Sequence, residues 1–379
     1  MRILLLSGNT GEGHNSAAKA LKEYFESRGC QCDIHDGLQY MRFSSGRFIS
    51  WGHIVIYRKL PFVFGIGYRY AQWLQSHTPF QKKLNARTKK MARRLPPRRR
   101  RLKEFIEKGN YDAVIAVHSF IAAMTSDLRK CGALDIPSFF LATDYSCYPG
   151  VNQMEVDAWM VPHRNLIPEY IALGVPEDRI VVTGIPVRSE FFTRQDRTAV
   201  RRELGLPEDK KIVVLSCGSM GASSMGRMVV ALTETLPDNA LLVAICGKNK
   251  VLERNLRKIV RSKKLMVLGF VDRMSAYMDA ADLFITKPGG LSTSEAVHKR
   301  VPTVLVHAVP GCETGNLKFM TAIGCAATAK GPISAAKLVS ETLKTGKSLD
   351  YLAQKCEAEF TGNAAQQVYE TVMQHINAK

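Results

Sequence analysis

Short apolar runs recur along most of the chain and alternate with longer segments of helical character. The runs are continuous rather than alternating and rich in Val, Ile, Leu and Phe; examples are Ile3–Leu6, Ala113–Val117, Ser138–Leu141, Ile180–Val182, Ile212–Leu215, Leu241–Ile245 and Leu283–Ile285. A strand without a polar face has to be covered on both sides, as in a parallel sheet between two layers of helices. The alternation of such strands with helices predicts an α/β, doubly wound fold.

The strand-and-helix pattern occurs twice. It begins afresh at Lys210, after the polar connector 193–209, and the length of 379 residues fits two domains at about 150 residues each. We expect two facing Rossmann-like domains, over residues 1–192 and 193–355, each with a parallel sheet flanked by helices. Residues 356–379 are expected to form a helix that returns to the first domain.

One segment, 37–103, departs from this pattern because it is rich in aromatic residues and lacks clear strand boundaries. It closes with the stretch 82–103, which holds twelve basic residues and no acidic one. The whole chain has 53 Lys and Arg against 34 Asp and Glu, a net charge of +19, so removing these twelve leaves +7. Such a charge indicates an anionic partner: nucleic acid, a phosphate-bearing ligand or an acidic membrane surface.

The N-terminus and the cysteines indicate a cytoplasmic protein. The first apolar run is shorter than the apolar core of a signal peptide, and no stretch reaches the roughly 18 apolar residues of a membrane-spanning helix. None of the nine cysteines forms a C-x-x-C pair. An odd number of cysteines without metal-ligand spacing favours reduced thiols.

A first glycine-rich motif, 7–16, reads SGNTGEGHNS between the first strand and the next helix. Its glycines permit a tight turn, and the helix start offers free N–H groups to an anion. The spacing differs from the dinucleotide G-x-G-x-x-G, yet Asp33 or Asp36 keeps a nicotinamide site open as an alternative. His14 is a candidate proton acceptor. The plainer interpretation is a structural loop with a loop histidine.

A second turn, LSCGSMG at 215–221, follows the first strand of the second domain. Its backbone N–H groups and a serine hydroxyl suit a diphosphate, although an ordinary loop between a strand and a helix has the same composition. Two such turns in two domains make a stronger case than either alone.

The third motif is the most specific one. TKPGGLSTSEA at 286–296 is followed by VPGCETGN at 309–316. We expect Ser292 or Thr293 to cap a helix with Glu295 in its first turn. Glu295 then either caps that helix or accepts both hydroxyls of a ribose, and Glu313 and Asn316 suit the hydroxyls of a sugar.

Together these motifs resemble the monogalactosyldiacylglycerol synthase and processive diacylglycerol glucosyltransferase family. They are more distantly similar to the peptidoglycan N-acetylglucosaminyltransferase that acts on a lipid-linked precursor. Order and spacing agree over essentially the whole chain. The resemblance implies a GT-B fold, a UDP-sugar donor, a lipid acceptor, and inversion at the anomeric carbon with no bound metal and no further cofactor. No acidic D-x-D pair precedes the donor loop, which agrees with this chemistry.

The resemblance also implies roles for individual residues. His14 or Asp144 would take the proton of the acceptor, with Gly11, Gly13 and His118 on the acceptor side. The donor would be held by a larger set: Gly218, Ser219 and Gly221 at the diphosphate, Phe270 and Val271 at the uracil, Gly289, Gly290, Ser292, Thr293 and Glu295 at the ribose loop, and Glu313 and Asn316 at the sugar.

Two positions depart from the family pattern. Cys312 stands where the family usually has Gln before the acid of the loop, which leaves glucose or galactose open as the donor sugar. Tyr148-Pro149 stands where a histidine often follows the Thr-Asp pair, which affects the acceptor assignment.

The basic stretch is expected to meet an anionic membrane surface. The upstream aromatic residues would enter the interface, and each basic residue would contribute about 1 kcal/mol near acidic head groups. The residues concerned are Lys89, Lys90, Arg93, Arg94, Arg98, Arg99, Arg100 and Arg101. A solvated basic face is the alternative, and no nucleic-acid module is recognisable, so nucleic acid is not expected as a partner.

The sequence therefore predicts a hexosyltransferase that moves glucose or galactose from a UDP-sugar to diacylglycerol or a glycosyl-diacylglycerol. It would sit peripherally on the cytoplasmic face of the membrane. The alternatives are transfer to a polyprenyl-diphosphate-linked acceptor and, less favoured, a nicotinamide-dependent enzyme.

Overall fold

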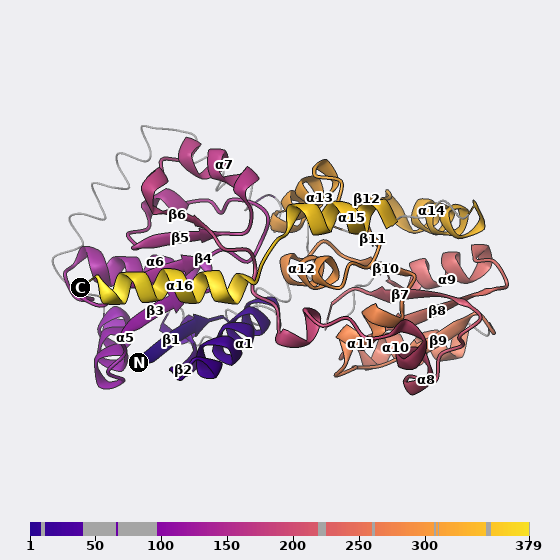
Figure 1. Ribbon diagram of the computed structural model, residues 1–379, viewed down its shortest axis with the longest axis horizontal. Helices are drawn as coiled ribbons and strands as arrows, with labels where there is room; N and C mark the ends of the chain where they lie inside the picture. Colours follow the sequence, from indigo (N-terminus) through magenta and orange to yellow (C-terminus); the bar gives the residue numbers. More distant parts are fainter. Residues whose placement is uncertain are drawn as a thin grey trace. The chain divides into compact units, whose positions relative to one another are not determined.

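The computed structural model describes residues 1–8, 12–40, 66, 97–218, 225–259, 262–306, 308–309, 311–345 and 350–378. It divides into two compact units, which are treated separately below. The first unit comprises residues 1–188, 309–312 and 362–379; the second comprises 189–308 and 313–361. Each contains a six-stranded parallel sheet flanked by helices (Figure 1). The predicted α/β class with two parallel sheets is confirmed.

The sheet of the first unit has the order β2-β1-β3-β4-β5-β6. Its strands are β1 (Arg2–Ser7), β2 (Gln31–Asp36), β3 (Ala113–Ala116), β4 (Ser138–Leu141), β5 (Ala158–Val161) and β6 (Ile180–Val182). The helices are α1 (Glu12–Ser27), α5 (Pro97–Lys108), α6 (Ser119–Lys130), α7 (Ile167–Ala172) and α16 (Ala364–Asn377). β3, β4 and β5 are wholly buried, and β1 is buried except for Arg2, as continuous apolar runs require.

The last helix of the chain, α16, belongs to the core of the first unit. Val368 and Val372 are fully buried there beside residues of α1. The ring of Tyr369 lies 5.2 Å from that of Phe25, in an edge-to-face arrangement. The side chain of Asn363 caps the helix by accepting from two backbone N–H groups. The chain thus returns to its first domain after completing the second one.

The sheet of the second unit has the order β12-β11-β10-β7-β8-β9. Its strands are β7 (Lys211–Ser216), β8 (Ala240–Ile245), β9 (Leu265–Leu268), β10 (Leu283–Thr286), β11 (Thr303–Leu305) and β12 (Ala327–Thr328). The helices are α8 (Arg197–Glu203), α9 (Met225–Thr235), α10 (Lys250–Ile259), α11 (Met274–Ala280), α12 (Gly290–His298), α13 (Cys312–Ala322), α14 (Gly331–Thr345) and α15 (Asp350–Glu359).

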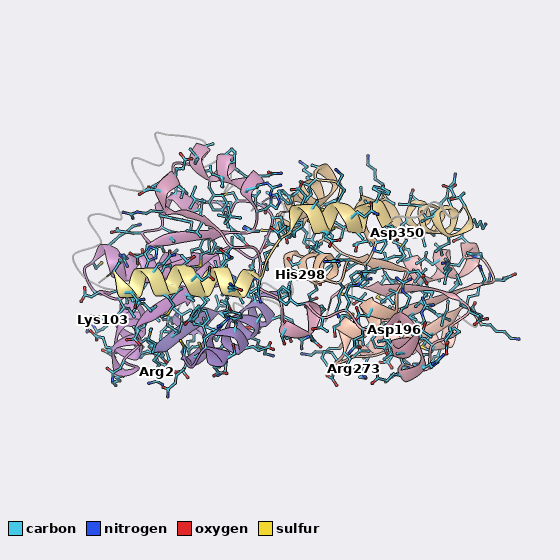
Figure 2. All side chains as sticks on the ribbon, in the orientation of Figure 1. Arg2, Lys103, Asp196, Arg273, His298 and Asp350 are labelled. Atoms are coloured by element: carbon cyan, nitrogen blue, oxygen red, sulfur yellow. The ribbon has the colours of Figure 1, made fainter. Side chains whose placement is uncertain are left out.

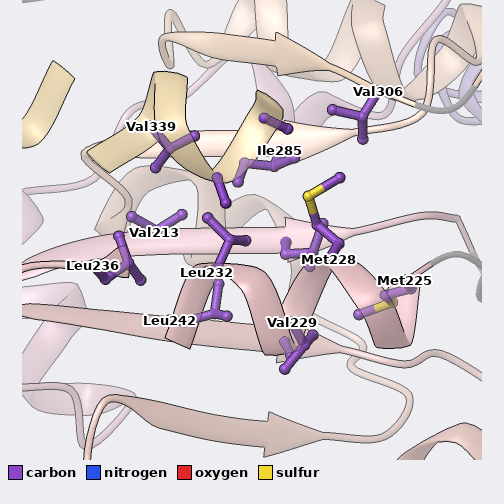
Figure 3. Packing of buried hydrophobic residues seen from close by; sticks show 14 of the residues in the cluster. Val213, Met225, Met228, Val229, Leu232, Leu236, Leu242, Ile285, Val306 and Val339 are labelled. Carbon is purple, nitrogen blue, oxygen red and sulfur yellow. The ribbon is translucent and has the colours of Figure 1, made fainter. Parts of the chain in front are cut away.

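The core of the second unit lies between its sheet and the pair α9 and α14. Leu232 of α9 and Val339 of α14 pack against Val213 and Ile285 of the sheet (Figure 3). All four side chains are essentially inaccessible to solvent. Burying a side chain of this kind contributes about 1.5–3 kcal/mol, so this layer anchors the strands whose ends carry the donor motifs.

Both sheets reverse their direction of winding once. In the first unit β2 lies on one side of β1 and β3 on the other; in the second, β8 and β10 lie on either side of β7. In the first unit, the loops that follow β1 and β3 therefore run in opposite directions from the carboxyl ends of these strands. The loops that follow β7 and β10 do the same in the second unit. Ligands of open α/β sheets bind at such switch points.

A buried ion pair joins three segments of the second unit. Lys299, directly after α12, lies 2.7 Å from Asp279 of α11, and both side chains are 1% exposed. The same ammonium donates to the carbonyl of Thr193 at 2.5 Å. Nearby, the ring of Phe192 lies 4.5 Å from that of His298 on α12, which Figure 2 labels. Residues 192–193 are thus held on the second unit by α12.

We expect Lys299→Met to destabilise the protein by about 3–5 kcal/mol because it leaves the Asp279 carboxylate buried without its cation. The double variant Lys299→Met/Asp279→Leu should recover much of that loss, since it removes the uncompensated charge. Urea unfolding followed by circular dichroism measures both. A double variant as unstable as the single one would show that the Thr193 contact, rather than the charge pair, carries the effect.

Within the described ranges, no helix is long and apolar enough to cross a membrane.

Candidate functional site

His14 lies at the switch point of the first sheet, in the first turn of α1. Its Nδ1 is 2.8 Å from the carbonyl oxygen of Val117, directly after β3, and 2.9 Å from the hydroxyl of Thr143, after β4. A carbonyl oxygen only accepts hydrogen bonds, so Nδ1 carries the proton of the neutral ring. The lone pair is then on Nε2. This tautomer is the one that a general base requires.

The surroundings of His14 keep its ring neutral. Burial lowers the pKa of His14 below its ordinary value of 6.5, while the charge of Asp144 and the Val117 carbonyl act in the opposite direction. Asp144 accepts a hydrogen bond from the hydroxyl of Tyr148. Burial raises the pKa of Tyr148, and the Asp144 carboxylate adds to that rise, so Tyr148 stays a donor. The two candidate bases thus interact electrostatically, since the charge of Asp144 raises the pKa of His14.

His118 joins His14 from the other side of the switch point. The two ring centroids are 4.6 Å apart. Nδ1 of His118 caps α6 by accepting from the N–H of Phe120 at 3.2 Å, so its neutral ring carries the proton on Nε2. Gly8 makes room for this ring, since an added Cβ there would lie 3.1 Å from His118 Cδ2. His14 and His118 thus lie side by side; their place at the acceptor stays a prediction.

The two carboxylates that kept a nicotinamide site open have local partners. Asp33 accepts from the guanidinium of Arg2 at 2.8 Å and from the hydroxyl of Tyr111 at 3.0 Å. Asp36 accepts from the N–H of Leu38 and so closes the turn that follows β2. Both therefore have a structural use in the first unit.

Lys287 lies at the switch point of the second sheet and was not selected from the sequence. Its Nζ is 2.5 Å from Oε1 of Glu313, and the side chains are 23% and 9% exposed. Gly218, after β7, has a φ of +80°, and an added Cβ there would lie 3.0 Å from Lys287 Cε. The absence of a side chain at Gly218 thus leaves room for the lysine, which brings positive charge beside the turn expected to hold the diphosphate.

The helix α12 begins earlier than the sequence suggested. Its N-cap is Gly289, which makes no side-chain cap, so the expected cap at Ser292 or Thr293 is wrong. Glu295 lies in the second turn and not the first, which removes the interpretation that it merely caps the helix. The hydroxyl of Thr293 donates to the carbonyls of Gly289 and Gly290 and is buried. Ser292 and Glu295, three residues apart, retain partial exposure on one helix face.

Asn316 is fully buried in α13. Its amide donates to the carbonyl of Pro288 at 2.9 Å and so joins the loop after β10 to the helix that carries Glu313. In this arrangement Asn316 fixes the position of the Pro288–Gly289 turn. Glu313, by contrast, is the acidic residue of the first turn of α13 and reaches Lys287.

Phe270 lies after β9 and is 53% exposed. The ammonium of Lys248, after β8, lies 5.7 Å from the centre of its ring. An added Cβ at Gly269 would lie 2.7 Å from a carboxylate oxygen of Glu253, so the backbone passes close to α10 there. Val271 is partly exposed beside Phe270. Together they form an accessible aromatic and backbone edge beyond the strand ends.

Several expected site residues lie outside the described ranges: Gly11, Ser219, Gly221, Lys89, Lys90, Arg93 and Arg94. Gly13 is in the first turn of α1, beside His14. Of the basic residues on α5, Arg100 and Arg101 are exposed, whereas Arg99 pairs with Asp127 of α6 at 3.0 Å. Among the described side chains, no group of three or more His, Cys, Asp or Glu is arranged to hold a metal ion.

Two family models match the chain. The monogalactosyldiacylglycerol (MGDG) synthase model matches residues 14–187, and the C-terminal domain of glycosyltransferase family 28 matches residues 212–316. A processive diacylglycerol beta-glucosyltransferase of Bacillus cytotoxicus is 27% identical over 331 residues, which cover 86% of this chain and 81% of the relative. These matches confirm the resemblance read from the motifs.

Solved structures agree with the fold. Acinetobacter baumannii MurG superimposes with a TM-score of 0.62 at 18% identity, covering 98% of this chain and 99% of that one. Anabaena HepE, in complex with UDP and glucose, gives 0.58 at 13% identity, covering 99% and 100%. Residues 14–187 thus resemble the MGDG synthase family and residues 212–316 the family 28 glycosyltransferase C-terminal domain, and the chain is a glycosyltransferase with the two domains of a GT-B fold.

Proposed function

We propose that the protein transfers glucose from UDP-glucose to the hydroxyl group of diacylglycerol or of a glucosyl-diacylglycerol. The observation that carries the proposal is the His14 contact with the Val117 carbonyl, which leaves Nε2 ready to accept a proton. The names of the curated relatives support diacylglycerol as the acceptor and glucose as the sugar, and the UDP complex of a structural neighbour supports the donor.

The acceptor reaction follows from the first unit. The hydroxyl oxygen attacks the anomeric carbon from the face opposite the diphosphate, so a C–O bond forms while the bond to the phosphate oxygen breaks. The hydroxyl proton passes to His14 Nε2. The Asp144 carboxylate stabilises the resulting imidazolium, because its charge raises the affinity of His14 for the proton.

The donor reaction follows from the second unit. Negative charge develops on the diphosphate as UDP leaves, and it is met by the start of α12, which lacks a side-chain cap, and by the ammonium of Lys287. Glu295 would accept the ribose hydroxyls, Phe270 and Val271 would lie at the uracil, and Glu313 would contact the sugar. The start of α12 and the Lys287 ammonium supply the positive charge that a metal ion provides in other transferases, so the proposed reaction needs no metal ion.

The acceptor is a lipid, so the protein has to reach a membrane. The exposed Arg100 and Arg101 on α5, together with the basic residues that precede them in the sequence, favour an anionic surface. The proposed location is peripheral, on the cytoplasmic face.

The assay that tests this function incubates the protein with diacylglycerol in mixed micelles and with UDP-glucose, UDP-galactose or UDP-N-acetylglucosamine. We expect UDP release and a glucosyl-diacylglycerol product to be fastest with UDP-glucose. Faster transfer from UDP-galactose would correct the sugar. Transfer to a polyprenyl-diphosphate-linked acceptor but not to diacylglycerol would overturn the acceptor class.

The pH dependence of kcat/KM distinguishes His14 from Asp144 as the base. The value of kcat/KM should fall on the acid side of the profile, because activity is lost once the His14 ring is protonated. The midpoint of this fall should lie below pH 6.5, because burial lowers the pKa of His14. Asp144→Asn should lower kcat by less than His14→Ala does and move this midpoint to still lower pH, since it removes a charge that raises the pKa of His14. His14→Ala should lose about 10²–10⁴-fold in kcat with UDP affinity unchanged. A pH-independent loss in Asp144→Asn, with His14→Ala active, would reverse the assignment.

Lys287→Met keeps the length of the side chain and removes its charge. We expect kcat to fall about 10²–10³-fold, the cost of losing one electrostatic stabiliser of a transition state. The control is Lys287→Met/Glu313→Gln, which also neutralises the carboxylate left without its partner. Because Glu313 is itself expected at the sugar, the double variant is compared with Glu313→Gln alone: recovery of thermal stability, with kcat still about 10²-fold below that of Glu313→Gln, supports a role of Lys287 at the diphosphate. Recovery of full activity would mean that Lys287 only neutralises Glu313.

A further inference from the structure

Phe120 is an exposed aromatic side chain next to the proposed base. It is the second residue of α6 and is 53% exposed. Its ring lies 5.4 Å from that of His118, which in turn lies 4.6 Å from that of His14. Three rings thus run from the proton acceptor to the surface of the first unit. No other aromatic residue in the described part of this unit is among the exposed large hydrophobic side chains.

The position of Phe120 is fixed by the same contact that orients His118. The N–H of Phe120 donates to His118 Nδ1, so the first turn of α6 and the imidazole hold one another. Ala123, one turn further along the same face, is exposed and too small to cover the ring. The exposed apolar surface therefore begins at Phe120, next to the buried His118, and continues along α6 to Ala123.

The same face of α6 becomes charged further along. Asp127 follows Phe120 by seven residues, which is about two turns or 10 Å, and it pairs with Arg99 of α5. Arg100 and Arg101 of that helix are exposed. An exposed aromatic ring suits the apolar part of a lipid, and exposed arginines suit acidic head groups.

We propose that Phe120 is the side chain on which the acyl part of the lipid acceptor lies while its hydroxyl reaches His14. The inference rests on the proposed function and adds to it the residue that recognises the acceptor. A diacylglycerol carries its reactive hydroxyl a few bonds from two acyl chains. A ring two residues beyond His118 is at the right place to contact those chains without touching the proton acceptor.

The test compares Phe120→Ser, Phe120→Leu and the control Ile171→Ser, which removes an exposed apolar side chain, 39% accessible, from α7 of the same unit. Activity is measured in mixed micelles against the surface fraction of diacylglycerol and against UDP-glucose. Phe120→Ser should raise the KM for diacylglycerol roughly ten-fold, the effect of losing one apolar contact, and leave the KM for UDP-glucose unchanged. The KM for diacylglycerol of Phe120→Leu should lie near that of the wild type, and the KM of Ile171→Ser should equal the wild-type value.

Further measurements separate this contact from other uses of the ring. Thermal unfolding of Phe120→Ser should match wild type, because the His118 cap on α6 does not involve the ring. The inference is overturned if the KM for diacylglycerol is unchanged, or if Phe120→Ser loses binding equally to phosphatidylglycerol vesicles with and without diacylglycerol, which would assign the ring to the bilayer. The inference is also overturned if analytical ultracentrifugation shows that Phe120→Ser disrupts a dimer of the wild-type protein while the KM for diacylglycerol stays at the wild-type value. A wild-type enzyme inactive on diacylglycerol would refute the proposed function instead.

Discussion

Both candidate sites depend on one constraint of parallel sheets. Two parallel strands cannot be joined by a tight hairpin, so every connection crosses a face of the sheet, and its loops gather at the carboxyl ends of the strands. Where winding reverses, two of those loops separate and leave a place for a ligand. In the first unit this occurs between β1 and β3, with His14 on one side and His118 on the other. In the second it occurs between β7 and β10, with Gly218 and Lys287.

The two switch points differ in their electrostatics. In the first, desolvation lowers the pKa of the His14 ring, and a backbone carbonyl selects the tautomer with a basic Nε2. In the second, an ammonium and the start of a helix without a side-chain cap gather positive charge. A base and an anion-stabilising group require different surroundings, and separate sheets allow each to be built without disturbing the other. The α9 and α14 layer packs beneath the strands from which the loops of the second unit leave.

The seven apolar runs named from the sequence coincide with seven strands; β2, β5, β9, β11 and β12 were not among them, although β5 and β9 are themselves apolar. β2 carries Asp33 and His35 and lies at the edge of its sheet, so its pattern is polar. β12 has two residues, too few for any periodicity. The start of α12 was placed too late because Ser292 and Thr293 are common cap residues, whereas the helix begins at Gly290 and the Thr293 hydroxyl turns inward. Local propensity does not report which side of a short helix faces the core.

The sequence by itself determined the two-domain α/β class, the glycine-rich turns at strand ends and the family resemblance. Buried parallel strands are visible in it as continuous apolar runs, and the motifs are visible by their spacing. Only the tertiary structure decided which side chains meet. The Nδ1 contact of His14 comes from residues 103 and 129 positions away, and Lys287 approaches Gly218 and Glu313 from another strand end. Such contacts depend on strand order, which adjacent residues do not encode. The tautomer of a histidine and the burial of an asparagine follow from that order.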